Sequence, residues 1–427
     1  MNTGNSATRA ATSPQQLPLF RKFPALGAKL PHVSLGIFPT PVEKVDQLGT
    51  ALGLDRLYMK RDDLSGTVYG GNKVRMLEFL LGGALRSNAK EVLTVGYAGS
   101  NQALALAIYA DQLGLKCSTY LLPQANAHYV RRNLLASYRH HARLHACNYL
   151  SLIGGVLGGL IRATFQNGTF PSFIQPGGSS PLGIAGYINA ALELREQIDA
   201  GLLPEPDRIY VPLGSMGTTI GLMLGLKVAG IRSRIIAVRV LEEILASPWL
   251  LRRQYRDTSA YLHKLDPSFP KLDGRMEDLE IRNEFLGDGY AQFTAKDVES
   301  AKLTREHGGI IMNGTYSAKA FSALVDDARQ GVLKDKNILF WNTYNSRDIS
   351  SITDGIDYHL LPRGFHHYFE DAVQPLDKEG FDRYPFPTCP HRAQKNVFHG
   401  KHPPSHHRNQ TGIIRQLTTV SIPVSKG

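Results

Sequence analysis

The sequence predicts an α/β protein with open parallel sheets and helices on both faces. From about residue 19 to about residue 370, short runs of β-branched and apolar residues alternate with helical stretches. The strand-like runs are often followed by glycine-rich or polar turns that open a helix. Strands separated by helices of about 10 to 15 residues form parallel sheets that are covered on both sides.

The strand and helix signals follow one another along the chain. Strands are expected at residues 91–96, 208–212, 234–240 and 337–342, and helices at residues 101–113 and 219–229. In parallel sheets of this kind, ligands bind beyond the carboxyl ends of the strands, where loops turn into helices. The loops that follow these strands are therefore the first places to search for a functional site.

Length and composition limit the classes of protein to which the chain can belong. A chain of 427 residues with 42% hydrophobic content is long enough for two or three domains with sizeable cores. The longest apolar stretch, residues 150–161, contains four glycines and is too short to span a bilayer. Residues 1–16 lack the apolar core of a secretory signal. We therefore expect a protein that does not enter membranes.

Cysteine usage indicates a reducing compartment. Cys117, Cys147 and Cys389 are too few and too scattered for a disulfide framework or a zinc cluster. The chain is therefore predicted to be cytoplasmic and to hold no metal. The absence of acidic residues before Glu43 weakly indicates a transit peptide instead, but the segment has no amphipathic period.

The charge and the two ends of the chain carry little functional signal. The net charge of +11 comes from basic residues spread along the chain, and no nucleic-acid motif accompanies them, so no nucleic-acid partner is expected. Residues 1–18 are predicted to be disordered, as is the basic tail of residues 375–427, rich in histidine and proline. Metal binding by the tail remains an alternative, although its spacing matches no recognised zinc site.

A lysine follows two glycines in the run Tyr69-Gly70-Gly71-Asn72-Lys73. The glycines let the backbone approach a flat ligand, and the helical pattern that follows places the lysine at the start of a helix. A lysine held in this way can form a Schiff base with an aldehyde. The alternative is a surface lysine that only begins a helix.

A second motif joins a strand to a helix and suits a phosphate. The run comprises Gly214, Ser215, Met216, Gly217, Thr218 and Thr219. Its small residues expose backbone amides, the helix start adds positive potential, and the hydroxyls add donors. The run lacks the Gly-Lys-Ser/Thr ending of Walker-type ATP sites. A plain glycine-rich turn is the alternative.

Two further runs supply candidate substrate groups. Ser100, Asn101 and Gln102 follow the strand at 91–96, where they either cap a helix or grip a carboxylate. Tyr316 and Ser317 stand at another helix start. A tyrosine at such a position either packs with its hydroxyl in water or reaches into a site.

Together these motifs resemble the pyridoxal-phosphate (PLP) enzymes of the 1-aminocyclopropane-1-carboxylate deaminase and D-cysteine desulfhydrase family. The resemblance also includes Phe38-Pro39-Thr40-Pro41 and the run 60–66, and it ends before the tail. It implies that Lys73 holds the cofactor with Asn72 beside it, that the loop 214–219 binds the phosphate, and that Asn101 contacts the ring hydroxyl. It further implies that Ser100, Asn101, Gln102 and Tyr316 face the substrate and that Ser317 and Thr343 lie near the cofactor. Ser100 is expected to orient the substrate or to relay a proton to or from Lys73, and Tyr316 to act as an acid-base group or a hydrogen-bond partner.

The resemblance also implies a fold and an assembly. Family members have the tryptophan-synthase-β-like fold (fold type II), with two α/β domains and the cofactor in the cleft between them. Carried onto this chain, the large domain covers residues 19–74 and 196–374, and the small domain covers residues 75–195. A homodimer acting on a small amino acid is expected.

Ser317 favours one reaction within the family. Cyclopropane-ring-opening members carry glutamate at this place, which could keep the pyridine nitrogen protonated. A neutral hydroxyl would leave a weaker electron sink, sufficient when a good leaving group departs from Cβ. The sequence therefore predicts a PLP-dependent lyase that carries out α,β-elimination, most like D-cysteine desulfhydrase. The alternatives are the cyclopropane-carboxylate deaminase, an amino-acid racemase and a non-catalytic PLP-binding protein.

Two departures from the family pattern concern the substrate side. The family usually shows His-Thr-Gly-Gly after a strand, whereas this chain has Asn342-Thr343-Tyr344-Asn345. Ala103 and Leu104 stand where a polar or basic residue is more usual. The changes favour an altered substrate over a lost cofactor.

Overall fold

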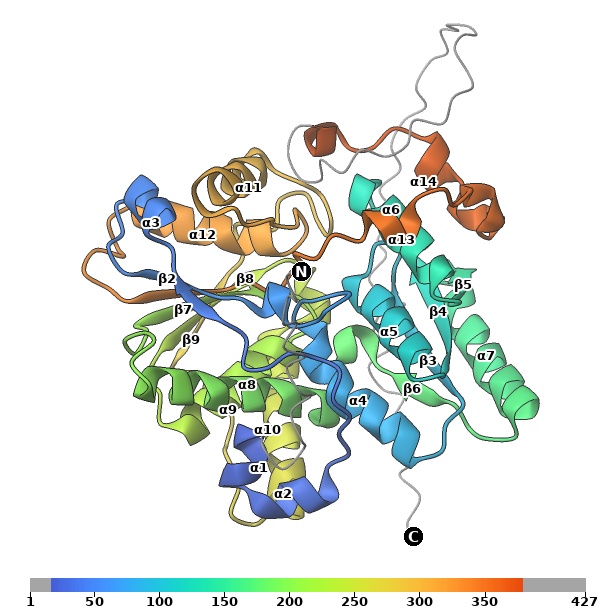
Figure 1. Cartoon of the computed structure of the whole chain (residues 1–427), viewed down its shortest axis with the longest axis horizontal. Helices are drawn as coiled ribbons and strands as arrows, with labels where there is room; N and C mark the ends of the chain where they lie inside the picture. Colours follow the sequence, from blue (N-terminus) through green and yellow to red (C-terminus); the bar gives the residue numbers. More distant parts are fainter. Residues whose placement is uncertain (1–16, 379–427) are drawn as a thin grey trace, which may run out of the picture.

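Two β-sheets organise the protein in the computed structural model, which describes residues 17–378 (Figure 1). The larger sheet has six strands in the order β1-β2-β10-β7-β8-β9. Its strands are β1 (Val42–Lys44), β2 (Leu57–Lys60), β7 (Arg208–Leu213), β8 (Arg234–Arg239), β9 (Leu279–Arg282) and β10 (Ile338–Trp341). All neighbouring strands run parallel except β1 and β2, which are antiparallel.

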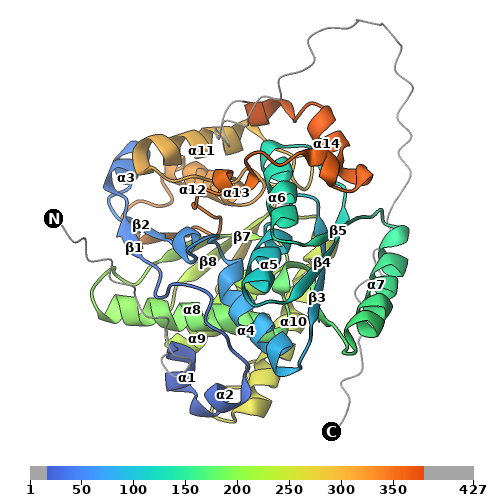
Figure 2. The ribbon, with the colours of Figure 1, turned by 45° about the vertical axis from the view of Figure 1, so that its right-hand side comes forward.

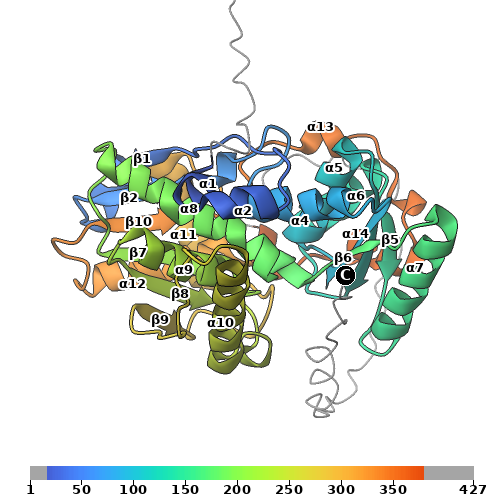
Figure 3. The ribbon, with the colours of Figure 1, turned by 90° about the horizontal axis from the view of Figure 1, so that it is seen from below.

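The smaller sheet is inserted between strands of the larger one in the sequence. Its four strands run parallel in the order β5-β4-β3-β6. They are β3 (Glu91–Tyr97), β4 (Lys116–Leu122), β5 (Arg143–Ala146) and β6 (Ser172–Ile174). Seen from below, the two sheets and their helices form two units side by side (Figure 3). The predicted α/β class with parallel sheets is confirmed.

Helices cover both faces of each sheet (Figures 1 and 2). Those of the larger unit are α1 (Pro18–Lys22), α2 (Pro24–Lys29), α3 (Asp46–Leu52), α8 (Pro181–Asp199), α9 (Gly217–Ala229), α10 (Pro248–Leu265), α11 (Ala295–Gly308) and α12 (Ser317–Arg329). Those of the smaller unit are α5 (Asn101–Gln112), α6 (His128–Arg139) and α7 (Ser151–Asn167). Helix α4 (Lys73–Arg86) joins the two units, and α13 (Ser350–Thr353) and α14 (His367–Glu370) lie near α6.

Close packing of α8 against α9 fixes the loop that precedes α9. A Cβ atom on Gly221 would lie 2.3 Å from the Cβ of Tyr187, and one on Gly225 would lie 2.5 Å from the Cβ of Ala191. Only glycine lets the two helices approach so closely, because a methyl group at either position would collide with α8. The start of α9 is therefore held rigidly against the core.

A buried cluster of charges fixes α4 in the same way. Arg75 on α4 donates to Asp62 Oδ1 at 2.7 Å and to Glu193 Oε2 at 2.9 Å, and Lys60 Nζ donates to Glu193 Oε1 at 2.5 Å. Burial alone would raise the pKa of Asp62, but the Arg75 guanidinium outweighs it and lowers this pKa to about 2. The cluster ties β2, α4 and α8 together and so sets where α4 begins.

The described chain overlaps slightly with the two segments that were predicted to be disordered. Residues 17 and 18 belong to the start of the fold, and residues 375–378 form a short 3-10 turn, η7 (Pro375–Lys378). The rest of both segments, with Cys389 and the tail histidines, lies outside the described residues. No helix in residues 17–378 is long and apolar enough to cross a membrane.

Candidate active site

Loops from both sheets meet beside the first turn of α4. They follow the carboxyl ends of β3, β6, β7 and β10, which is where parallel sheets place ligands. The predicted residues come from three of these loops and from the starts of α4 and α12. Hydrogen bonds and close contacts link these segments to one another, so the structure brings nearly all the predicted residues into one region.

Lys73 is the first residue of α4 and is enclosed there. The preceding Gly71 has a φ of 98°, and a Cβ on it would lie 2.9 Å from the carbonyl oxygen of Thr343. Lys73 Nζ donates to the carbonyl oxygen of Gly177 at 3.0 Å. Burial lowers the pKa of Lys73 to about 8. At pH 7 about a tenth of the amine is then neutral, against fewer than about one in a thousand at the ordinary pKa.

The loop between β7 and α9 carries the residues that were predicted to bind a phosphate. Met216, immediately before the helix, has a left-handed backbone with a φ of 70°. Ser179, from the loop after β6, donates to Ser215 Oγ at 2.9 Å and accepts from the Gly217 amide at 3.1 Å. Asn72 Nδ2 donates to Thr218 Oγ1 at 2.9 Å. The lysine segment and the β7–α9 loop are thus in direct contact.

The loop after β3 carries the predicted substrate residues. Ser100 caps α5 by accepting a hydrogen bond from the Ala103 amide at 3.2 Å. Asn101 Oδ1 accepts from the Tyr69 hydroxyl at 3.2 Å and from Asn133 Nδ2 at 3.0 Å. The capping role and a ligand role are compatible, because the Ser100 hydroxyl can still donate and the Asn101 amide nitrogen is still available as a donor.

Gln102 points away from this loop into the small unit. It is buried, and its Oε1 accepts a hydrogen bond from Thr94 Oγ1 on β3 at 3.2 Å. Its Nε2 has no hydrogen-bond partner within the described part of the chain. A direct contact of Gln102 with the substrate therefore stays a prediction, and Nε2 is the side-chain atom left without a partner to make it.

A group of tyrosines joins the two units beside the site. Tyr316 immediately precedes α12, and its hydroxyl is hydrogen-bonded to that of Tyr290. The ring of Tyr290 lies against that of Tyr97 from β3, with 4.4 Å between centroids and the two planes tilted by 31°. A Cβ on Gly214 would lie 3.7 Å from the Tyr316 ring, which places this tyrosine beside the β7–α9 loop. Burial raises the pKa of Tyr316 to about 12, so its hydroxyl stays protonated at neutral pH.

The residues after β10 contact the segment that leads to Lys73 and the helix α6. The Thr343 carbonyl accepts the Asn72 amide at 3.0 Å, which places Thr343 beside the lysine segment. Tyr344 accepts a hydrogen bond from Arg132 of α6. Asn345 stands where the family usually has a glycine, and its Oδ1 accepts the Gly70 amide at 2.6 Å.

Ser317 is fully buried at the first position of α12. Its Oγ accepts a hydrogen bond from the Asn313 amide at 2.8 Å. The hydroxyl hydrogen therefore remains available for a second group.

The sequence analysis missed several site residues. Tyr290 lies in an irregular segment between β9 and α11, where no periodicity marks it. Gly177 and Ser179 belong to the run Pro176-Gly-Gly-Ser-Ser180, which follows β6 and precedes α8. This run has the same strand–loop–helix form as the two motifs that were selected, so its glycines and serines were a usable signal.

The residues present fit a phosphorylated aldehyde cofactor. Lys73 offers an amine with a lowered pKa that donates to a neutral backbone carbonyl. Thr219 Oγ1, in the first turn of α9, is buried without a hydrogen-bond partner in the described chain. A hydroxyl donor left open at a helix start suits a phosphate oxygen.

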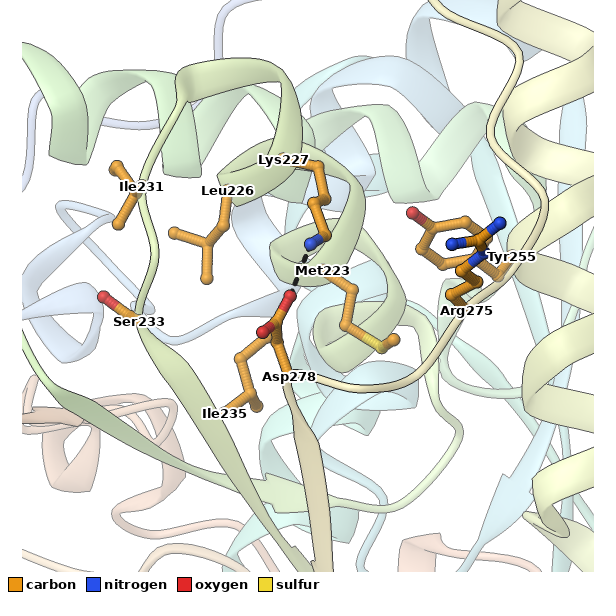
Figure 4. A pocket seen from close by; sticks show the side chains of 9 residues that line it. All are labelled: Met223, Leu226, Lys227, Ile231, Ser233, Ile235, Tyr255, Arg275 and Asp278. Atoms are coloured by element: carbon orange, nitrogen blue, oxygen red, sulfur yellow. Dashed lines mark ion pairs between the residues drawn. The ribbon is translucent and has the colours of Figure 1, made fainter.

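A separate hollow on the larger unit holds none of the predicted residues (Figure 4). It is lined by apolar side chains of α9 and β8 together with Tyr255 of α10 and Arg275, and Lys227 is paired with Asp278 at 2.5 Å. Within residues 17–378, no group of three histidine, cysteine or acidic side chains is placed to hold a metal ion.

Comparison with known proteins agrees with this geometry. Residues 33–343 match the family model described as pyridoxal-phosphate dependent enzyme. A Pyrococcus horikoshii protein provisionally named a 1-aminocyclopropane-1-carboxylate deaminase is 34% identical over 75% of this chain and 93% of its own. The D-cysteine desulfhydrase of Klebsiella pneumoniae is 30% identical over 74% of this chain and 94% of its own. A crystal structure of a 1-aminocyclopropane-1-carboxylate deaminase homologue, 31% identical, covers 77% of this chain and 94% of its own with a TM-score of 0.64.

Proposed function

Because the chain belongs to the family of pyridoxal-phosphate dependent enzymes, we propose that it is a lyase that carries out α,β-elimination on a small amino acid. Its activity is most like that of a D-cysteine desulfhydrase, releasing pyruvate and ammonia, with sulfide when the substrate is cysteine. PLP supplies an aldehyde that reacts with amines and a ring that draws electrons from the substrate Cα.

Lys73 binds the cofactor and then moves the Cα proton. Its burial and its lowered pKa keep part of the amine neutral near neutral pH, which both attack on the aldehyde and proton removal require. The carbonyl of Gly177, 3.0 Å from Nζ, holds the amine in place before either step.

The loop after β3 orients the substrate. Ser100 and Asn101 stand at the start of α5, where free amide donors and the helix dipole favour a carboxylate. In the described part of the chain the Ser100 side chain caps α5 and is not hydrogen-bonded to a general base, so its hydroxyl orients the substrate and does not abstract a proton.

Tyr316 acts as a donor. A pKa of about 12 keeps its proton in place at neutral pH, and the Tyr290 hydroxyl fixes the direction of the phenol. The pair can therefore donate a hydrogen bond or a proton to the leaving group on Cβ.

The observation that carries elimination over ring opening is the serine that follows Tyr316. Ser317 presents an uncharged hydroxyl, already engaged by the Asn313 amide, where ring-opening relatives carry a carboxylate. A hydroxyl does not hold a proton on the pyridine nitrogen, and the weaker electron sink is enough for a thiolate leaving group. The deaminase reaction is the second candidate, favoured by the names of two of the relatives.

The test is a substrate panel on the purified protein. D-cysteine, L-cysteine, D-serine and 1-aminocyclopropane-1-carboxylate are supplied in turn, and the keto acid is identified as pyruvate or 2-oxobutanoate. The protein should absorb at about 410 to 430 nm, as expected of PLP bound to a lysine. Lys73→Ala should abolish this band, and the exposed Lys90→Ala should keep it. A band that survives Lys73→Ala contradicts the assignment, and 2-oxobutanoate as the sole product contradicts the elimination.

The proposal extends to a homodimer in the cytoplasm. Helix α7 exposes Leu157, Ile161 and Phe165 by 54, 58 and 85%, and Leu150, which immediately precedes the helix, is exposed by 79%. With neighbouring apolar side chains they offer on the order of 600 Å² of apolar surface, most of the roughly 800 Å² per partner of a standard interface. The sole charged residue of α7, Arg162, turns to Glu91 at 2.8 Å. An uncharged face can meet its own copy without repulsion across a two-fold axis.

Light scattering tests the assembly. The wild type should be dimeric and Leu157→Asp monomeric, while Leu202→Asp, an exposed leucine on another surface, should stay dimeric. A monomeric wild type, or a dimer that survives Leu157→Asp, contradicts this interface.

The two cysteines of the described chain, Cys117 and Cys147, are free, which supports a reducing compartment.

A further inference from the structure

A segment near the end of the described chain crosses from one unit to the other. We name residues 366–377 the C-terminal strap. It includes α14 and lies after residue 343, where the family match ends. Figures 1 and 2 show α14 beside α6 and the following turn close to α11. The strap therefore touches both units without forming part of either sheet.

The strap is anchored on both sides by specific hydrogen bonds. Gln374 accepts the Phe293 amide at 2.8 Å and donates to the Ala291 carbonyl at 3.0 Å, both on the larger unit. On the smaller unit, Arg131 of α6 donates to the Tyr368 carbonyl at 2.6 Å, and Asp377 accepts the His128 amide at 2.6 Å. The strap is thus held in one place relative to the loop between β4 and α6.

Tyr368 reaches from the strap to that loop. Its ring is buried, and its hydroxyl accepts the Gln124 amide at 2.9 Å and faces the Gln124 carbonyl at 3.3 Å. A phenol can accept one hydrogen bond and donate another, so a single side chain fixes both peptide groups of Gln124.

Gln124 in turn holds the loop that carries Ser100 and Asn101. Its Oε1 accepts the Gly99 amide at 2.8 Å, and its Nε2 donates to the Tyr129 hydroxyl at 2.6 Å. Tyr129 then bonds to Thr315 Oγ1 at 2.8 Å, one residue before Tyr316. Gln124 therefore links the strap to the loop 97–101 on the smaller unit. Through Tyr129 it also links the strap to the segment before Tyr316 on the larger unit.

We propose that Tyr368 is a positioning residue, which sets the conformation of the loop 97–101 through Gln124. The C-terminal strap, outside the part of the chain shared with the family model, would thereby help to hold the substrate loop in its binding geometry. That the loop binds substrate rests on the proposed function; that Tyr368 orders the loop does not. The two statements can be tested separately.

Hydrogen exchange of the PLP-loaded protein tests the ordering of the loop. Deuterium uptake is measured in peptides that cover residues 97–104. Tyr368→Phe removes the hydroxyl and keeps the ring, so the Gly99 amide should exchange about tenfold faster than in the wild type. Tyr358→Phe is the matched control, because it also removes a phenol hydroxyl near the strap, one that donates to the exposed Glu370 at 3.5 Å. Unchanged exchange in Tyr368→Phe, or equal acceleration in both variants, overturns the proposal.

Kinetics with the substrate found in the panel test the consequence for binding. Tyr368→Phe should raise KM about fivefold while the absorbance of bound PLP stays unchanged. In a Gln124→Ala background, where the link to Gly99 is already cut, the same substitution should leave KM nearly unchanged. A full fivefold effect in that background, or a loss of thermal stability without any change in KM, overturns the positioning role. If no amino acid is turned over, the proposed function fails and the exchange measurement still decides whether Tyr368 orders the loop.

Discussion

Ser179 offers a sharp test of the proposed phosphate site because its neighbour Ser180 provides an internal control. The Ser179 hydroxyl donates to Ser215 Oγ at 2.9 Å and accepts the Gly217 amide at 3.1 Å, so Ser179→Ala removes two hydrogen bonds from the β7–α9 loop. At about 1 kcal/mol each, the loss amounts to about 2 kcal/mol. Without these bonds the loop is less ordered in the cofactor-free variant, and PLP must order it on binding. This cost should weaken the affinity for PLP about thirtyfold.

The assay is a PLP titration of the cofactor-free protein, followed by absorbance, with urea unfolding of each variant. Ser180 caps α8 by accepting the Gly183 amide at 3.3 Å. Ser180→Ala should therefore lower the free energy of unfolding by about 1 kcal/mol and leave the PLP dissociation constant unchanged. The reasoning is refuted if Ser179→Ala binds PLP as tightly as the wild type, or if both variants lose the same affinity.

Three further predictions concern Lys73, Asp62 and Tyr290. The rate at which PLP reacts with the cofactor-free protein should rise with pH to a midpoint near 8, the pKa of Lys73, because only the neutral amine attacks; stopped-flow absorbance that keeps rising to pH 10.5 would contradict this. Asp62→Asn should lower the free energy of unfolding in urea at pH 7 by about 3 to 5 kcal/mol, because it leaves the Arg75 charge buried without its nearest partner. Since the Asp62 pKa falls from 3.8 to about 2 on folding, its contribution is complete above pH 3.8 and is lost as the pH drops toward 2, so wild type and Asp62→Asn should converge there. Tyr290→Phe should lower kcat more than about tenfold with the PLP absorbance intact; an unchanged kcat would remove this pair from the chemistry.

Local patterns in the sequence predicted the parts of the fold that local forces determine. The runs at 91–96, 208–212 and 337–342 became β3, β7 and β10 because apolar runs between turn residues are buried as parallel strands. Lys73 begins a helix as expected, since the pattern of apolar residues after it has a helical period.

The order of the strands and the partners of the loops depend on contacts between distant residues. β10 lies between β2 and β7, nearly three hundred residues from one and more than a hundred from the other in sequence, and no local pattern specifies that place. Tyr290 and Gln124 lie in irregular segments. The role of each side chain there depends on contacts with residues distant in sequence, and no periodic pattern identifies it. Such residues become visible only when the chain is folded.

The two residues that replace glycines after β10 show how the substrate side can change while the lysine stays in place. A Cβ on Gly70 would lie 2.1 Å from the Asp63 carbonyl, so Gly70 can be held only through its backbone. Asn345 supplies such a contact, because its Oδ1 accepts the Gly70 amide at 2.6 Å. A residue that replaces a family glycine thus stabilises the segment that leads to Lys73. Tyr344 instead meets Arg132 of α6, and this contact between the two units, more than the lysine motif, is where we expect the choice of substrate to be made.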